Sequence, residues 1–130
     1  MLIKSVFNSF LKEQELRLAP STYNEYESVI LLFGHCLDSY AWNSLEKESP
    51  SYDEVHHSGK SFIDAYDHNH ILDSVGEFLG YFVPRKVMAG DEFTRKTCPR
   101  VIRKLLRWMQ SKELIHITSE EIKERCESQS

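Results

Sequence analysis

One apolar pattern constrains the fold of this chain more than any other feature. Between residues 22 and 40, large apolar side chains recur at alternating steps of three and four: Tyr23, Tyr26, Ile30, Phe33, Leu37 and Tyr40. This spacing places side chains on one face of an α-helix, so it predicts a long amphipathic helix with one buried side. Thr22 and Glu25 have the spacing of a capping box, which predicts that the helix begins with Ser21 or Thr22 as its N-cap.

Helical spacing recurs in three further stretches, at about residues 3–15, 75–83 and 98–112. The chain has only 5 Gly and 4 Pro, a scarcity that favours long helices over a many-turned β architecture. We therefore expect an all-α fold, a small bundle of four to five helices, formed by a single domain over residues 1–130. The predicted core draws on all four helices: Phe7, Phe10, Tyr26, Ile30, Phe33, Leu37, Phe78, Leu79, Phe82, Val101, Ile102, Leu105 and Met109.

Capping residues and prolines predict where the later helices begin and end. Ser74 and Thr118 each precede a glutamate by three residues, so a helix is expected to start at each of them. Pro84 predicts an end or a kink in the third helix. Pro99 suits the first turn of the fourth helix, where a missing amide donor costs nothing.

The segment at about residues 45–70 is acidic and rich in histidine, and it is harder to interpret. Ser49-Pro50-Ser51 predicts a turn, and Phe62, Ile63 and Tyr66 indicate a short helix. Imidazole and carboxylate groups can bind a divalent metal, but the spacing here matches no structural zinc pattern. We therefore expect no metal site among these side chains: His56, His57, Asp64, Asp67, His68 and His70.

Several classes of protein are not expected from this sequence. No apolar run approaches the roughly 18 residues that span a bilayer, and the first residues do not resemble a signal peptide. The three cysteines (Cys36, Cys98 and Cys126) are odd in number and widely spaced, which suggests a reducing, cytoplasmic location. No nucleophile elbow, P-loop or dinucleotide-binding fingerprint is present, so we expect no enzyme, no cofactor and no small-molecule substrate.

Charge is distributed very unevenly along the chain. Residues 85–112 hold nine basic and two acidic side chains, a net charge of +7, whereas the remainder carries −11 and the whole chain −4. Lys96, Arg100, Arg103 and Arg107 follow each other at steps of four, three and four, so they share one face of the fourth helix. Such a row repels itself unless it is neutralised, and phosphates are the usual neutralising groups.

This basic region is the candidate functional site, and double-stranded DNA is the expected partner. The candidate residues are Arg85, Lys86, Arg95, Lys96, Arg100, Arg103, Lys104 and Arg107. The alternatives that remain open at this point are an acidic protein partner, pairing with the chain's own carboxylates, and plain solvation of the basic side chains. The candidate carboxylates for internal pairing are Glu46, Glu48, Asp53 and Glu54.

Two segments together resemble the N-terminal core-binding domain of tyrosine recombinases and phage integrases. The first is FL at residues 10–11, followed by LAPSTY at 18–23 and by Tyr26 and Phe33. The second is VGEFLGYF at 75–82, followed by TRKT at 94–97 and VIRKLLRWM at 101–109. Together they cover about half the chain, in the order found in that family.

The resemblance implies a SAM-like helical bundle that clamps DNA without cutting it. The family's catalytic domain is absent, and none of the six histidines is followed by arginine at the third position, as the family's H-x-x-R motif requires. The segment at 45–70 is also longer and more acidic than in that family. The alternative function is a helical protein-interaction module that uses this acidic segment.

Overall fold

The described part of the chain is built from helices, as the sequence predicts. The structure, a computed structural model, describes residues 1–40, 62–86, 90 and 92–127. In chain order the elements are α1 (Ile3–Arg17), α2 (Pro20–Tyr40), α4 (Phe62–Ala65), α5 (Asn69–Glu77), the π-helix η2 (Phe78–Phe82), α6 (Val83–Lys86), the π-helix η3 (Phe93–Thr97), α7 (Cys98–Ser111) and α8 (Ser119–Glu127). These residues include no β-strand, only an isolated bridge between Leu2 and Asp67. None of these helices has the length and apolar character needed to span a membrane.

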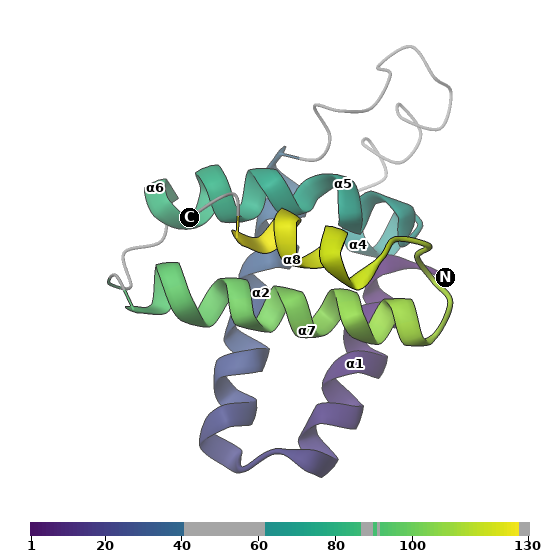
Figure 1. Cartoon of the computed structure of the whole chain (residues 1–130), viewed down its shortest axis with the longest axis horizontal. Helices are drawn as coiled ribbons and strands as arrows, with labels where there is room; N and C mark the ends of the chain where they lie inside the picture. Colours follow the sequence, from purple (N-terminus) through teal and green to yellow (C-terminus); the bar gives the residue numbers. More distant parts are fainter. Residues whose placement is uncertain (41–61, 87–89, 91, 128–130) are drawn as a thin grey trace.

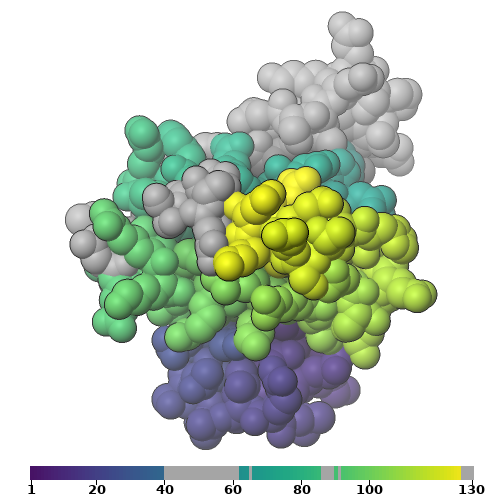
Figure 2. Space-filling view, viewed as in Figure 1, coloured from purple at the N-terminus to yellow at the C-terminus, as the bar shows by residue number. Residues whose placement is uncertain are grey.

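Two helical layers cross each other. Helices α1 and α2 form an antiparallel hairpin, and α7 crosses this hairpin so that the hairpin tip projects beyond it (Figure 1). The run from α5 through η2 to α6 lies above α7, and α8 packs against both α5 and α7. In the space-filling view the hairpin tip forms a separate lobe below α7 (Figure 2). The place where the projecting part of the hairpin meets α7 is the part of the fold that matters for the candidate site.

The core lies where these layers meet, and all thirteen predicted core residues are buried. The ring of Phe33 on α2 stacks on Phe78 of η2 with the ring centroids 4.8 Å apart, and it contacts Phe7 of α1 at 5.8 Å. Three elements distant in sequence therefore share one aromatic cluster. The predicted short helix at Phe62 is confirmed as α4, and Phe62 is also buried.

Of the three helix starts that capping residues predict, two are wrong and one is confirmed. α2 begins at Pro20, whose missing amide costs nothing there, and the Tyr23 amide donates to the Ala19 carbonyl at 2.9 Å. Ser74 lies inside α5, which begins at Asn69. Burial of an isoleucine contributes about 1.5–3 kcal/mol and a cap about 1 kcal/mol, so the fully buried Ile71 extends the helix past the local capping signal. At α8, Thr118 Oγ1 accepts the Glu121 amide at 3.1 Å, as predicted.

Both prolines in the second half of the chain are accommodated in the same way. A proline inside an α-helix clashes with the carbonyl four residues earlier. Ahead of Pro84 the helix widens into η2, and the Val83 amide donates to the Phe78 carbonyl, five residues back. Ahead of Pro99 it widens into η3, and Cys98 donates to Phe93 in the same pattern. The prediction that Pro84 could end its helix is therefore wrong, because α6 continues through it. Pro99 lies in the first turn of α7 as predicted, but helical backbone already precedes it.

Candidate nucleic-acid interface

Helix α7 has one buried and one basic side. Val101, Ile102, Leu105, Leu106 and Met109 are all completely buried. Arg100, Lys104 and Arg107 are exposed, while Arg103 is half-buried. The apolar stripe fixes this orientation, because burying it turns the residues between its members toward solvent. The exposed basic row therefore runs through Lys104, with Arg103 set further back.

The structure brings six of the eight predicted residues onto one helical run and places the other two on another. Arg95 and Lys96 are exposed on η3 and continue directly into α7. Arg85 lies on α6, which belongs to the helical run above α7 (Figure 1), and its guanidinium lies 5.1 Å from the Tyr81 ring centroid. Lys86 ends α6, and its side chain lies outside the described residues. We call the exposed residues Arg95, Lys96, Arg100, Lys104 and Arg107 the basic row.

Part of the positive charge is paired within the chain. Arg100 Nη2 lies 3.4 Å from Glu25 Oε2 of α2, and both side chains are about half exposed, at 50% and 45%. An exposed pair of this kind contributes about 0–1 kcal/mol, so it neutralises Arg100 only weakly. The carboxylates proposed for this role at 46, 48, 53 and 54 lie outside the described residues. Within the described ranges, Arg95, Lys96, Lys104 and Arg107 have no acidic side chain at ion-pair distance.

A cavity opens where the basic row meets the projecting part of α1. Its volume is 290 Å³. It is lined by Phe10, Glu13, Gln14 and Arg17 of α1 and by Lys104, Arg107 and Trp108 of α7. The Phe10 and Trp108 rings meet edge to face, with centroids 5.9 Å apart, and form an aromatic wall. We call this space the α1–α7 cavity.

The polar atoms of the α1–α7 cavity are almost all donors. Its one carboxylate, Glu13, accepts a hydrogen bond from Trp108 Nε1 at 2.7 Å and lies 3.6 Å from Lys112 Nζ. Gln14 is only 6% exposed, and its Oε1 accepts a hydrogen bond from Arg17 Nη2 at 2.7 Å. Both contacts of Glu13 use Oε2, so what remains available is Glu13 Oε1, the Gln14 amide nitrogen and the cationic side chains around them.

The sequence indicated neither Arg17 nor Gln14 as a site residue. Arg17 stands in LRLAP, where the helical pattern breaks, and Gln14 is a polar residue at a helix position with no distinguishing neighbour. Only the crossing of α1 by α7 brings them beside Lys104 and Arg107. No local sequence signal could have revealed this contact, because the two helices are about ninety residues apart.

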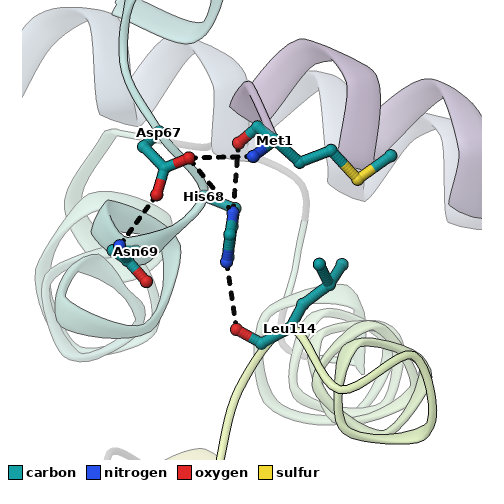
Figure 3. Close-up of polar contacts among 5 residues, drawn as sticks. All are labelled: Met1, Asp67, His68, Asn69 and Leu114. Atoms are coloured by element: carbon teal, nitrogen blue, oxygen red, sulfur yellow. Dashed lines mark hydrogen bonds and ion pairs between the residues drawn. The ribbon is translucent and has the colours of Figure 1, made fainter.

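The histidine-containing segment contributes a structural cluster. His68 Nδ1 lies 3.1 Å from the Met1 carbonyl oxygen, and its Nε2 lies 3.0 Å from that of Leu114 (Figure 3). Asp67 accepts hydrogen bonds from the Met1 amino group at 2.9 Å and from Asn69 Nδ2 at 2.7 Å. We call Met1, Asp67, His68, Asn69 and Leu114 the N-terminal cluster; it joins the start of α1, the start of α5 and the loop after α7.

Neither this cluster nor the cysteines provide a reactive centre among the described residues. No group of three His, Cys, Asp or Glu side chains in the described ranges is arranged to hold a metal ion, and His56 and His57 fall outside those ranges. Cys36, Cys98 and Cys126 are free and buried. Burial raises the pKa of the Cys36 and Cys98 thiols to about 12, with the charge of Glu77 adding to the effect on Cys36. Both thiols therefore stay protonated, and poorly nucleophilic, at neutral pH.

Comparisons with known proteins found no relative of this chain. No family model, curated protein or solved structure matches the chain. The resemblance to integrase core-binding domains therefore stays a prediction that depends on the residues quoted for it.

Proposed function

We propose that this protein binds the phosphate backbone of double-stranded DNA through the basic row, in a non-catalytic role. The observation that carries the proposal is the exposure of all five cations on one continuous helical run, from Arg95 to Arg107. Of these, Arg100 alone pairs with a carboxylate of the described residues. The resemblance to a DNA-clamping integrase domain is compatible with this role.

The dimensions of the basic row suit contact with a phosphate backbone. At a rise of 1.5 Å per residue, Lys96 and Arg107 are separated by about 16 Å along the axis. This is about half of the 34 Å helical repeat of DNA, so the row can follow one stretch of backbone. Five exposed cations, with Arg17 beside them, allow about four to six phosphate contacts, each of which releases condensed counterions.

Binding of this kind should be weak and largely independent of sequence. Phosphate contacts fix the position of a protein on DNA but do not read bases. The chain as a whole carries a net charge of −4, so its overall field opposes association with a polyanion. With about four to six contacts, the logarithm of the affinity should fall with the logarithm of salt concentration at a slope of about −4 to −5.

A salt titration of fluorescently labelled duplex DNA tests the proposal. The triple variant Arg95→Ala, Lys96→Ala and Arg100→Ala removes three cations of the row that do not line the α1–α7 cavity. It should reduce the slope by about 2.7, because each lost contact contributes about 0.9. The control is the triple variant Lys12→Ala, Lys123→Ala and Arg125→Ala. It has the same net charge as the first variant, and its substitutions lie at exposed positions outside the basic row, so its salt slope should match that of the parent protein.

Two results would contradict this function. The first is no binding of duplex DNA by the parent protein at low salt. The second is an equal change of slope in both triple variants, since this would mean that net charge, and not the basic row, determines binding. The alternative function, a protein-interaction module, rests on acidic residues outside the described ranges.

A further inference from the structure

We infer that the α1–α7 cavity is a binding site for the phosphate monoester of a nucleotide. The inference goes beyond the proposed contact with duplex DNA, which needs only an exposed surface. It concerns a half-open cavity in which the side-chain amide of Gln14, three cations and the indole ring of Trp108 converge.

The donors in this cavity lack acceptors. Lys104 and Arg107 reach no acceptor among the described residues, and Arg17 donates only to the Oε1 atom of Gln14. Gln14 is more than nine-tenths buried, and with Oε1 engaged its Nε2 amide has both hydrogens to donate. Gln14 Nε2 is not among the fully enclosed side-chain atoms that lack a partner, so it is accessible from the cavity, where an oxygen of a ligand can accept from it.

The charge of the lining identifies that acceptor as an anion. Arg17, Lys104 and Arg107 contribute three positive charges, and Glu13, the lining carboxylate, is engaged by Trp108 and Lys112. The three cations would repel each other in an empty site, whereas a dianionic phosphate accepts hydrogen bonds from all of them. A phosphate monoester supplies this charge and three terminal oxygens, while a bridging phosphate of a duplex carries one charge and two.

The aromatic wall specifies what the phosphate is attached to. Phe10 is fully buried and stacks on Tyr26, so the ring that faces the open space is that of the half-buried Trp108, whose centroid lies 5.8 Å from Lys112 Nζ. Aromatic side chains of this kind stack on nucleic-acid bases. The volume of 290 Å³ is at the lower end of the range for small-ligand sites, which fits a single nucleotide.

The ligand could be a free mononucleotide or the 5′-phosphorylated end of a DNA strand, since both present the same chemistry. The probe is thymidine 5′-monophosphate, titrated against the full chain carrying Trp42→Phe, which leaves Trp108 as the single tryptophan. A change in Trp108 fluorescence should accompany binding, and inorganic phosphate should compete. Thymidine without phosphate should bind at least roughly tenfold more weakly, because it lacks the charged acceptor.

Two substitutions at Gln14 separate binding from folding. Gln14→Leu removes the amide donor and should weaken nucleotide binding roughly tenfold. Gln14→Glu keeps an acceptor for Arg17 but introduces a negative charge, and it should abolish binding. Lys12→Ala, at an exposed position of α1 that does not line the cavity, should leave nucleotide binding unchanged. Thermal melts confirm that each variant is folded.

Oligothymidines with and without a 5′-phosphate distinguish the two sources. Tighter binding of the phosphorylated strand than of the mononucleotide supports a strand end as the ligand, and equal binding supports the free nucleotide. The inference is overturned if the mononucleotide does not bind, if thymidine binds equally well, or if Gln14→Glu binds normally. Mononucleotide binding without duplex binding would leave this inference standing and refute the proposed function.

Discussion

Two clusters of polar residues differ in how far their hydrogen-bonding groups find partners within the chain. In the N-terminal cluster both ring nitrogens of His68 lie close to carbonyl oxygens, and Asp67 accepts from two donors (Figure 3). In the α1–α7 cavity Glu13 Oε2 and Gln14 Oε1 are engaged, whereas Lys104 and Arg107 face open space without an acceptor among the described residues. The first arrangement finds its partners within the chain, and the open donors of the second are the basis of the proposed nucleotide site.

The difference teaches which polar residues serve the fold and which serve a partner. A satisfied hydrogen bond contributes about 0.5–1.5 kcal/mol, whereas an unsatisfied buried donor costs about 1–3 kcal/mol. The exposed cations of the cavity are hydrated, so their cost to stability is the repulsion between neighbouring positive charges, a few tenths of a kcal/mol per pair. We expect substitutions in the N-terminal cluster to destabilise the protein, and substitutions of the exposed cations of the cavity to spare or even raise its stability.

The largest effect should come from the apolar side of α7, directly beneath the cavity. Leu105 is fully buried and its neighbour Lys104 is exposed. Leu105→Ala should lower the free energy of unfolding by about 2–5 kcal/mol, because it removes buried methyl groups and leaves a void. Lys104→Ala should change it by less than about 0.5 kcal/mol. Urea denaturation measures both, and equal effects would mean that α7 is oriented differently.

Leu105 also illustrates why the fold could be predicted from the sequence. Its helical spacing with Val101, Ile102 and Met109 marks a buried face, and all four residues are buried. The start of α5 could not be predicted in the same way, because the capping signal at Ser74 is local whereas Ile71 is buried by tertiary contacts. Periodicity therefore identified the buried faces, and long-range packing decided the ends of the helices.

The second effect should come from the N-terminal cluster. His68→Ala removes the ring that lies between the carbonyl oxygens of Met1 and Leu114, and the His68 side chain is only 15% exposed. It should lower the free energy of unfolding by about 1–3 kcal/mol. His116→Ala, at an exposed position in the loop after α7, is the matched control and should have little effect. A His68→Ala protein as stable as the control would show that the cluster does not hold these segments together.

The candidate site was predictable only in part. Amphipathic spacing predicted a basic side of the fourth helix, and Arg100, Lys104 and Arg107 are exposed there. The cavity was not predictable, because Gln14 and Arg17 become neighbours of that row only when α1 and α7 cross. The pairing of Arg100 with Glu25 was missed for the same reason.

A smaller effect, of opposite sign, should come from the cavity. Lys104 lies between Arg100 and Arg107 on α7, at spacings of four and three residues. Lys104→Glu replaces two repulsive pairs by two attractive ones, so it should raise the free energy of unfolding by a few tenths of a kcal/mol per pair. The gain should shrink in high salt, which screens exposed charges. A loss of stability at low salt would contradict the view that these cations are kept for a ligand.

The smallest effect concerns the acid side of the stability curve. A hydrogen bond from the Met1 amino group, with a smaller contribution from the charge of His68, lowers the pKa of Asp67 below its ordinary value of 3.8. A carboxylate with a lowered folded-state pKa contributes stability above the unfolded-state pKa, and this contribution disappears as the pH falls through the folded-state pKa. Asp67 is 45% exposed, so solvent screening keeps the contribution small.

Asp67→Asn tests this contribution, because it removes the ionisable group and keeps a hydrogen-bond acceptor of similar shape. The parent protein should lose its small advantage over this variant as the pH falls below 3.8. Asp73→Asn, at an exposed position on α5, controls for the loss of one negative charge. Urea denaturation from neutral to acidic pH measures the difference. A difference between the parent and Asp67→Asn that stayed constant down to the lowest pH would contradict this prediction. It would mean that the Met1–Asp67 contact stabilises the N-terminal cluster through packing and not through the charge of the carboxylate.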